Sequence, residues 1–455
     1  MGAPASFRFT TLGCRLNQAE SDAMAEELAS SGLVAAAEDE EPDVVVVNTC
    51  TVTREATKAS RMALRRAIRS HPAAKVVAIG CYAESDPDEL ARIEGVDLVL
   101  GNAAKETFGE ALGANQATGP LLRVGFRRDP ARPEAAAPGA VLAAAAAATP
   151  AGPVAAPMKV RANLKAQTGC DEWCTFCIIP KTRGPLRSMD EDRLVDEAAR
   201  RVRAGAKELV LTGVHLGKYR FDEGGDERDL IRLLQRLLEI DGVMRLRLSS
   251  ILSAHLTDEV IAYLADEPRI CRYLHVPLQA GHDEILAAMH RPYRIAEFLE
   301  RVEAADTRLP ALALATDIIV GFPGETEQHF QATLDVVRRV GFSKLHVFRY
   351  SARDDTPAAG MADAVAPEIK KDRSKRLIEV GNEIRARFLH AHLGRPLRVL
   401  VEDERVVDGV GICSGQTDDY VRVWFEGTGL LGRLVDVVGH EVRADGIRGG
   451  TVVGV

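Results

Sequence analysis

The sequence predicts an α/β protein with three folded parts: an N-terminal open parallel α/β sheet, a partial (βα)6 barrel and a small C-terminal antiparallel β-barrel. Extended apolar runs alternate with helical segments over residues 5–102 and again over 158–391. In residues 392–455, short β-rich runs are broken by Gly and Asp-Gly. Hydrophobic residues make up 46% and charged residues 27% of the 455-residue chain, which is typical of globular rather than disordered proteins.

The first part is notable for where its extended runs end. FRFTTLG is followed by Cys14, VVVVNT by Cys50 and KVVAIG by Cys81, and a fourth run, VDLVLG, completes the pattern. Parallel strands place their carboxyl ends along one edge of the sheet, where open α/β sheets bind their ligands. We therefore expect the three cysteines to meet at that edge. A single cysteine there is commonly a small buried hydrophobe, but three placed alike favour a shared site.

Two helices are expected after these strands. In the first, which runs to Ser31, Asn17 and Glu20 have the spacing of a capping box. The second spans 52–70, and five cations recur along one of its faces: Arg54, Lys58, Arg61, Arg65 and Arg69. Such a stripe suits phosphate contacts, which predicts an RNA-binding surface; a solvated helix face is the alternative.

Residues 103–157 interrupt the alternation. The stretch is rich in Ala, Pro and Gly and includes a run of six alanines. Because Pro punctuates it and no apolar face recurs, we expect a linker between the first two folded parts.

The second part contains six extended candidates separated by amphipathic helical segments: 161–167, 208–213, 245–251, 272–277, 312–320 and 344–350. A helix near 367–391 leads out of this part. Six such repeats suit a partial barrel whose active site lies at the carboxyl ends of the strands.

The stretch GCDEWCTFCIIP follows the first of these strands and carries Cys170, Cys174 and Cys177 in a C-x3-C-x2-C pattern. Structural zinc normally needs a second ligand pair, and the nearest downstream candidates, His215 and Cys271, are distant in sequence. An iron–sulfur cubane fits the pattern better, because three thiolates hold three irons and leave one iron open.

CDEWCTFC resembles the cluster-binding loop of the radical S-adenosylmethionine superfamily, with Phe176 at its aromatic position. The resemblance implies a [4Fe–4S] cluster on the three cysteines, whose open iron binds the amino and carboxylate groups of S-adenosylmethionine. Reductive cleavage of that cofactor then gives a 5′-deoxyadenosyl radical.

LGCRLNQAES, NTCTVTREA and IGCYAES resemble the N-terminal domain of the methylthiotransferases. This resemblance implies a second [4Fe–4S] cluster, held by Cys14, Cys50 and Cys81, whose open iron carries the sulfur to be inserted. Cys271 and Cys413 have no such partners and are interpreted as buried side chains.

Further segments resemble motifs of the same family: LTGVHLGKY, HVPLQAGHDEILAAMHRPY and TDIIVGFPGETEQHF. Ala280 stands where the family commonly has serine. The resemblance implies that S-adenosylmethionine is bound by Phe176, Thr212, Gly213, Gln279, Val320 and Gly321.

The family resemblance also implies the reaction. The motifs are most similar to the branch that methylthiolates C2 of N6-threonylcarbamoyladenosine at position 37 of tRNA. Isopentenyladenosine-37 of tRNA, or an aspartate of a ribosomal protein, is the alternative target, and a non-catalytic Fe–S or zinc RNA-binding protein is a distant alternative. The C-terminal part resembles the RNA-binding TRAM domain, although residues 391–455 carry seven arginines against ten acidic residues.

Composition limits the partners and the compartment. The formal net charge of −8 predicts that any nucleic-acid binding comes from local patches. No apolar run approaches the roughly 20 residues of a membrane span, and the first residues lack the features of a secretion signal. We expect a cytoplasmic enzyme that uses two [4Fe–4S] clusters and S-adenosylmethionine, acts on tRNA and receives electrons from a donor such as flavodoxin or ferredoxin. The sulfur donor stays open.

Overall fold

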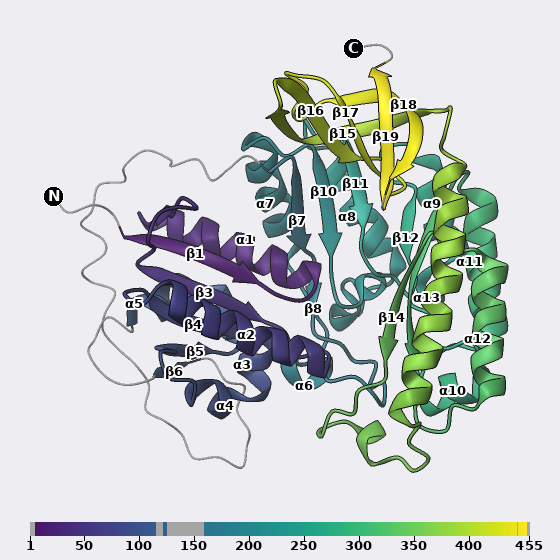
Figure 1. Ribbon diagram of the computed structural model, residues 1–455, viewed down its shortest axis with the longest axis horizontal. Coiled ribbons are helices and arrows are strands. Elements are labelled where there is room, and N and C mark those ends of the chain that lie inside the picture. Colours follow the sequence, from purple (N-terminus) through teal and green to yellow (C-terminus); the bar gives the residue numbers. More distant parts are fainter. Residues whose placement is uncertain (1–4, 115–121, 125–158, 444, 453–455) are drawn as a thin grey trace. The chain divides into compact units, whose positions relative to one another are not determined.

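The computed structural model describes residues 5–114, 122–124, 159–443 and 445–452 (Figure 1). The chain forms two compact units. Unit 1 combines the chain up to Pro157 with the later segment Cys177–Pro185, and unit 2 combines Met158–Phe176 with Leu186–Val455. No helix in the described ranges is both long and apolar enough to span a membrane.

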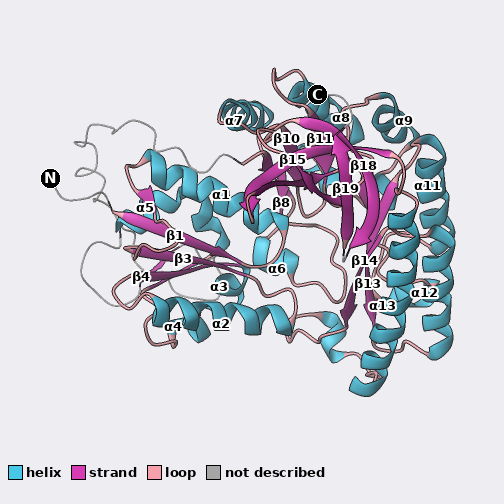
Figure 2. Cartoon of the chain, turned by 45° about the horizontal axis from the view of Figure 1, so that its top comes forward, coloured by secondary structure: helices cyan, strands magenta, loops and turns pink. Residues whose placement is uncertain are grey.

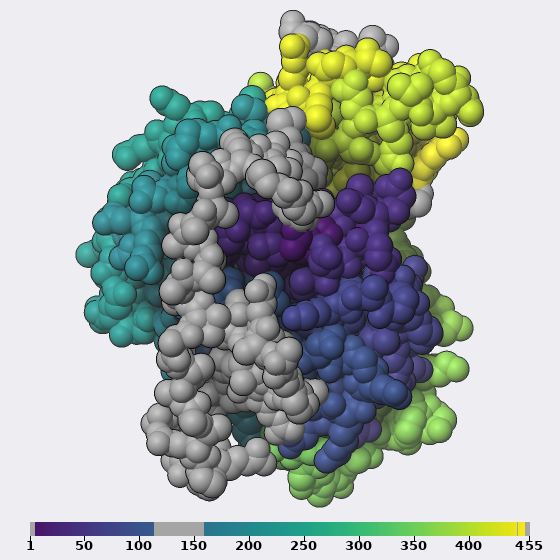
Figure 3. All heavy atoms as spheres, turned by 90° about the vertical axis from the view of Figure 1, so that its left-hand side faces the viewer, coloured from purple at the N-terminus to yellow at the C-terminus, as the bar shows by residue number. Residues whose placement is uncertain are grey.

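Unit 1 is built on one parallel sheet, which confirms the predicted open α/β architecture. Its six strands lie in the order β2-β1-β3-β4-β5-β6, with every pair parallel. Their bounds, in that order, are Val34–Ala35, Ser6–Thr11, Val44–Thr49, Lys75–Gly80, Leu98–Leu100 and Leu122–Val124. Figure 3 views the surface of this unit from the side on which its strands begin.

Helices cover both faces of this sheet (Figure 2). α1 (Arg15–Ser30) and α5 (Phe108–Ala114) pack on one face, and α2 (Arg54–Ser70) packs on the other, together with α3 (Cys81–Ser85) and α4 (Pro87–Ala91). The central strand β3 is buried along its whole length. Burial on both faces explains why its sequence, VVVVNT, is a continuous apolar run rather than an alternating one.

Two sequence predictions for unit 1 need correction. Cys14, not Asn17, is the N-cap of α1, and the side chains of Asn17 and Glu20 are buried rather than forming a capping box. The predicted linker is wrong at its start, because η1 (Asn102–Thr107) and α5 are folded and Phe108 is fully buried in the core. The rest of the predicted linker, including the six alanines, lies outside the described residues apart from β6.

Unit 2 contains the predicted partial barrel of six parallel strands. They form two sheets, β11-β10-β7 and β12-β13-β14, connected by the parallel bridges Leu246↔Ile270 and Ser250↔His275. The strands are β7 (Arg161–Lys165), β10 (Glu208–Thr212), β11 (Arg245–Leu248), β12 (Tyr273–His275), β13 (Ala313–Val320) and β14 (Lys344–Arg349).

Helices pack against the outside of these strands in a continuous hydrophobic core. They are α7 (Glu191–Arg203), α8 (Glu227–Leu238), α9 (Asp258–Asp266), α10 (Asp283–Ala288), α11 (Ile295–Arg308), α12 (Glu327–Val340) and α13 (Pro367–His390). Short elements fill the connections: β8 (Gln167–Thr168), β9 (Arg187–Ser188), η3 (Leu216–Lys218), η4 (Phe221–Glu223), η5 (Ser253–His255) and η6 (Pro357–Gly360). α6 (Ile179–Arg183) belongs to unit 1.

The C-terminal part closes into the predicted small barrel, with strand order β15-β16-β17-β19-β18. The strands are β15 (Pro396–Val407), β16 (Val410–Gln416), β17 (Arg422–Glu426), β18 (Leu434–Arg443) and β19 (Gly446–Val452). All of its pairs are antiparallel except β17 with β19, which is parallel.

Candidate active site

The structure places the three N-terminal cysteines at the carboxyl edge of the sheet in unit 1. Cys14 follows β1, Cys50 follows β3 and Cys81 follows β4. Cys50 and Cys81 are buried, whereas Cys14 is exposed. The pKa of Cys50 is raised to about 11, chiefly by burial, with the neighbouring Cys81 and Cys14 acting in the same direction. The three thiols are therefore within electrostatic range of one another.

Gly13 makes the approach of Cys14 and Cys50 possible. Its φ is +93°, and a Cβ at this position would lie only 2.8 Å from the Sγ of Cys50. Any other residue would be strained there and would also displace a thiol. This geometry explains why a glycine precedes the cysteine in the LGC motif of the first strand.

The spacing of the cysteines bears on what they could hold. Within the described ranges, Cys14, Cys50 and Cys81 are not among the groups of ligand atoms that all lie within 4.8 Å of one another. Thiolates on one zinc ion need that proximity, because each Zn–S bond is about 2.3 Å long. Three cysteines are the donor type that holds the irons of an iron–sulfur cluster.

In unit 2 the loop after β8 carries Cys170 and Cys174, and Cys177 begins the segment that packs with unit 1. This loop is fixed to residues 288–289, because the backbone and hydroxyl of Thr175 donate to the carbonyls of Met289 and Ala288 at 3.1 and 2.8 Å. Phe176 packs against the core of the unit.

An arginine that the sequence motifs do not single out contacts one of these cysteines. Nη1 of Arg291 lies 3.2 Å from the Sγ of Cys174, and its Nε donates to the hydroxyl of Tyr293 at 3.1 Å. The same hydroxyl donates to the carbonyl of Pro277 at 2.7 Å. Nη2 of Arg291 is buried and has no hydrogen-bond partner among the described residues. The arginine is thus positioned to donate to sulfur beside Cys174.

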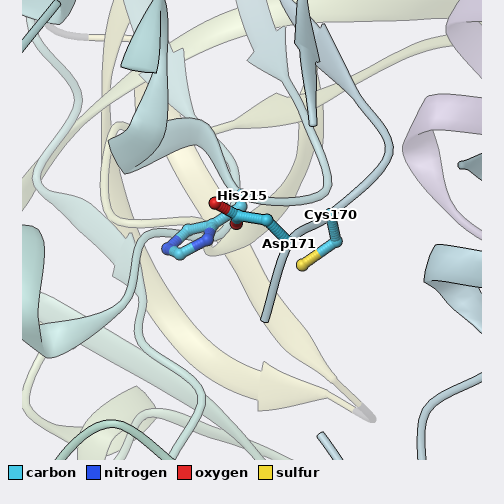
Figure 4. A group of neighbouring side chains, drawn as sticks. All are labelled: Cys170, Asp171 and His215. Carbon is cyan, nitrogen blue, oxygen red and sulfur yellow. The ribbon is translucent and has the colours of Figure 1, made fainter. Parts of the chain in front are cut away.

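His215 is the second residue of this site that was not predicted from the sequence. One ring nitrogen lies within 4.8 Å of both the Cys170 sulfur and an Asp171 carboxylate oxygen (Figure 4). Its side chain is 3% exposed, and neither ring nitrogen has a hydrogen-bond partner in the described structure. Burial lowers the pKa of His215 well below 6.5, and His255, Lys218 and Arg291 lower it further. A neutral imidazole with unused hydrogen-bonding capacity therefore faces the loop of Cys170.

Ion pairs and hydrogen bonds of a side-chain amide connect the loop of Cys170 to the segment of His215. Lys218 forms ion pairs with Asp171 at 3.0 Å and with Glu172 at 2.6 Å. Gln167 donates to the carbonyls of Thr168 and Gly169 and accepts from the backbone N–H of His215. Buried groups that lack partners cost folding free energy, so the orphan atoms of His215 and Arg291 fit a site completed by a bound group.

The residues predicted to bind S-adenosylmethionine differ in what they offer. Gln279 has a left-handed backbone at φ +68°, and its backbone bonds to Asp317 and Ile319. The Val320 side chain is buried in the core, and the Thr212 hydroxyl donates to the carbonyl of Leu164. These two residues therefore offer a ligand mainly their backbone.

The two glycines of this set are sterically restricted. A Cβ on Gly213 would lie 3.0 Å from Gln167, and one on Gly321 would lie 2.3 Å from Lys370. Gly321 also has φ +74°, and its N–H donates to the buried Glu325 at 3.0 Å. Glycine is therefore required at 321 on backbone grounds alone.

The two remaining cysteines are buried, as interpreted from the sequence. Burial raises the pKa of Cys271 to about 12, and Cys413 lies in the core of the C-terminal barrel, where its thiol donates to the carbonyl of Gly427.

The cationic stripe lies on the outer side of α2, although its members differ. Arg54, Lys58, Arg65 and Arg69 are exposed, but Arg61 is bound to Glu89 at 2.5 Å and to the Tyr82 hydroxyl at 3.2 Å. Arg65 and Arg69 also line a groove of about 650 Å³, whose lining includes Arg8, Arg66 and His71. The exposed cations and this groove make one basic surface, of which Arg61 is the least available member.

Comparisons with known proteins agree with this organisation. A model for the radical SAM superfamily matches residues 164–337, and a model described as an uncharacterized protein family, UPF0004, matches 6–101. The chain is similar in fold to the radical S-adenosylmethionine methyltransferase TsrM from Kitasatospora setae, with a TM-score of 0.55, 16% identity and coverage of 78% of this chain and 75% of that one.

Relatives that match nearly the whole chain identify its family more specifically than the similarity in fold does. The threonylcarbamoyladenosine tRNA methylthiotransferase MtaB of Bacillus subtilis is 37% identical over 95% of this chain and 93% of its own length. The tRNA-2-methylthio-N(6)-dimethylallyladenosine synthase of Sorangium cellulosum is 36% identical over 95% of this chain and 90% of its own. The chain therefore belongs to the radical SAM tRNA methylthiotransferase family.

Proposed function

We propose that this enzyme methylthiolates C2 of N6-threonylcarbamoyladenosine at position 37 of tRNA with two [4Fe–4S] clusters. The gathering of Cys14, Cys50 and Cys81 at one sheet edge carries this proposal, because a radical SAM enzyme with a single cluster needs only the other triad. The relatives named for threonylcarbamoyladenosine support the choice of nucleoside.

Each part of the chain has a role in this proposal. Residues 5–102 hold the cluster that carries sulfur, 158–391 form the radical SAM barrel, and 392–455 form a TRAM-like barrel that contacts RNA. The enzyme works in the cytoplasm, where flavodoxin or ferredoxin supplies electrons.

The protein's own groups bind, orient and shield the reacting molecules. Cys170, Cys174 and Cys177 hold the radical SAM cluster, which when bound and reduced supplies the electron that cleaves S-adenosylmethionine. Arg291 directs an N–H toward the sulfur of Cys174, and the neutral His215 offers a hydrogen bond beside Cys170. The backbone around Gly213, Gln279 and Gly321 lines the cofactor pocket.

Counting iron tests the two-cluster proposal. After anaerobic reconstitution we expect about eight irons per chain, because each cubane holds four. Cys14→Ala should halve the iron, retain 5′-deoxyadenosine formation and yield no methylthiolated tRNA. Methylthiolated product from that variant would refute the sulfur-carrying role of the N-terminal triad.

Nucleoside analysis tests the substrate. Mass spectrometry of tRNA from cells with and without the enzyme should show loss of 2-methylthio-N6-threonylcarbamoyladenosine in its absence. The synthase relatives support the alternative nucleoside, dimethylallyladenosine. Loss of that methylthiolated nucleoside instead would assign the enzyme to the other tRNA branch, and unchanged tRNA with a modified ribosomal peptide would move it to the protein target.

The exposed cations of α2 are proposed to contact the anticodon stem, with Arg61 contributing least because Glu89 already neutralises it. Arg65→Glu with Arg69→Glu should weaken tRNA binding and flatten its dependence on salt concentration. Arg338→Glu on α12, also an exposed helical position, is the matched control. Equal affinity of both variants in a filter-binding titration would exclude this surface.

A further inference from the structure

The end of α10 fixes the backbone of Arg291, the arginine that contacts Cys174. His290 has a left-handed backbone at φ +58°, and its N–H bonds to the carbonyl of Ala287 at 2.9 Å. The N–H of Arg291 bonds to the carbonyl of Leu286, also at 2.9 Å. This pair of bonds is the Schellman arrangement, which closes the C-terminus of a helix. Arg291 therefore leaves the helix from a defined backbone position.

The segment that contains Arg291 holds the cysteine loop at consecutive positions. Besides the two bonds to residues 288–289 described above, Nδ1 of His290 lies 3.1 Å from the carbonyl oxygen of Trp173. Arg291 completes the series with its 3.2 Å contact to the Sγ of Cys174. Consecutive residues of the segment thus contact consecutive residues of the loop. The contact between guanidinium and sulfur is therefore supported by the backbone on both sides.

The guanidinium of Arg291 uses only part of its hydrogen-bonding capacity. Nη1 donates to the Sγ of Cys174 and Nε to the hydroxyl of Tyr293, whereas Nη2 is buried without a partner among the described residues. Tyr293 is itself held, because its hydroxyl donates to the carbonyl of Pro277. A buried donor without an acceptor costs folding free energy. Nη2 is therefore positioned to donate to a group that the site binds.

The acceptor of the Nη1 bond is a sulfur that would ligate iron. A thiol is a weak acceptor, but a thiolate carries negative charge and accepts a stronger, charge-assisted hydrogen bond. Hydrogen bonds to the sulfurs of an iron–sulfur cluster are among the factors that set its reduction potential. A positively charged donor favours the reduced form, because that form carries one more electron. The contact with Cys174 therefore has the chemistry of a bond that tunes a redox potential.

We propose that Arg291 raises the reduction potential of the cluster on Cys170, Cys174 and Cys177 through this N–H···S bond, and that its Nη2 binds a second anionic acceptor there. The inference rests on the proposed placement of the radical SAM cluster on these three cysteines. A cluster sulfide and the carboxylate of S-adenosylmethionine both offer a negatively charged acceptor. The planar guanidinium presents its N–H groups as a rigid fork, which suits two neighbouring acceptors. Arg291 is thus a positioning residue of the cluster.

The test loads this cluster alone. In a background with Cys14, Cys50 and Cys81 changed to alanine, the reconstituted protein should bind about four irons. A redox titration followed by electron paramagnetic resonance measures its midpoint potential. Arg291→Met, which keeps the bulk but removes the charge and the donors, should shift the midpoint to more negative values, and Arg291→Lys should shift it less. Arg308→Met, at an exposed position of α11, is the matched control and should leave the midpoint unchanged.

Binding of S-adenosylmethionine identifies the second acceptor. Equilibrium dialysis of the oxidised proteins against S-adenosylmethionine measures its affinity for each variant. Binding to folded Arg291→Met that is weaker by about tenfold or more, as expected for the loss of a hydrogen bond to a charged group, would assign Nη2 to the carboxylate. Equal binding together with a shifted midpoint would assign Nη2 to a cluster sulfide. Either result supports the proposal.

The outcomes separate this inference from the proposal on which it rests. A folded background protein that binds no iron would refute the cluster on Cys170, Cys174 and Cys177. About four irons with a midpoint that Arg291→Met leaves unchanged would refute the role of Arg291 and leave the cluster in place.

A measurement on the background protein itself decides if Arg291→Met fails to fold by circular dichroism. The protein is labelled with arginine that carries ¹⁵N only in its guanidinium group. Pulsed electron paramagnetic resonance of the reduced cluster should then detect a ¹⁵N coupling across the N–H···S bond. Absence of any such coupling would overturn the proposal.

Discussion

Glu208, at the start of β10 in unit 2, forms ion pairs with three arginines. Its carboxylate is fully buried and pairs with Arg161 at 2.9 Å, with Arg247 at 2.8 Å and with Arg245. Burial opposes its charge, but the three arginines hold its pKa far below the usual range. Three guanidinium groups therefore converge on one carboxylate, and Arg161 pairs with Glu402 as well, at 3.2 Å.

Glu208→Gln should destabilise unit 2 by about 3–5 kcal/mol, because it leaves buried arginines without their anion. Both tryptophans, Trp173 and Trp424, lie in this unit, so their fluorescence during urea unfolding measures its stability. Asp403→Asn breaks an exposed pair with Arg405 and should cost no more than about 1 kcal/mol. Comparable losses in both variants would contradict a special role for the buried carboxylate of Glu208.

His392 predicts a pH effect on stability. Although burial opposes its charge, a 2.5 Å hydrogen bond to Asp419 raises its pKa above 6.5, with the Phe388 carbonyl adding and Arg385 opposing. Because the folded pKa is raised, this stabilisation is complete below about pH 6.5 and is lost as pH rises through the folded value. The stability difference between the wild type and His392→Gln should therefore shrink from pH 6 to pH 9. A difference independent of pH would show that His392 acts by packing alone.

At the scale of elements, a histidine takes part in the N-terminal cap of both α10 and α12: His282 is the N-cap of α10, and His329 belongs to the capping box of α12. Nδ1 of His282 accepts from the N–H of Glu284, and Nδ1 of His329 accepts from the N–H of Thr326. A neutral ring that accepts at Nδ1 carries its proton on Nε2. The centroids of the two rings lie 4.3 Å apart, close to Glu284. Because each Nδ1 accepts a backbone N–H, the two histidines serve as helix caps rather than as metal ligands.

The contact of α12 with Gly281, which precedes α10, predicts a steric effect. A Cβ on Gly281 would lie 2.3 Å from the Cα of Thr333 on α12, so Gly281→Ala should separate the backbones and cost about 1–3 kcal/mol. Gly360→Ala is the matched control, since nothing lies within 4 Å of its added carbon. The urea midpoint from tryptophan fluorescence should fall for the first variant and stay near the wild type for the second.

At the scale of the whole of unit 2, the C-terminal barrel packs against the strands of the partial barrel. Arg247 donates to the carbonyls of Thr417 and Asp418 at 2.9 and 2.7 Å, and Nη2 of Arg161 donates to the hydroxyl of Tyr420 at 2.7 Å. The ring of Tyr420 packs on Tyr273 with centroids 4.7 Å apart. The loop after β16 therefore satisfies the buried arginines around Glu208.

Removing residues 392–455 should therefore destabilise the barrel as well as any RNA contact. We expect the truncated protein to melt at a lower temperature than the full chain and to retain less iron at Cys170, Cys174 and Cys177 after reconstitution. Circular dichroism melting and iron analysis measure both effects. An unchanged melting temperature would show that the C-terminal barrel is only an appended module.

Much of the architecture was predictable because it depends on local patterns. The strands of both sheets follow from apolar runs, and a parallel sheet necessarily brings Cys14, Cys50 and Cys81 to one edge. The start of the supposed linker was misread because its alanines and glycines conceal one decisive core residue, Phe108. Asn17 and Glu20 have the spacing of a capping box, but their side chains form hydrogen bonds with residues distant in sequence.

The sequence by itself determined the fold class, the two cysteine triads and the family, because these reside in periodicity and in short motifs with fixed spacing. Only the tertiary structure decided which side chains contact one another around the cysteines. Arg291 and His215 stand in motifs without a ligand signature, and Glu20, Lys105 and Arg183 are residue types that usually lie at the surface. Burial turns contacts of such groups, made between residues far apart in the chain, into strong electrostatic interactions.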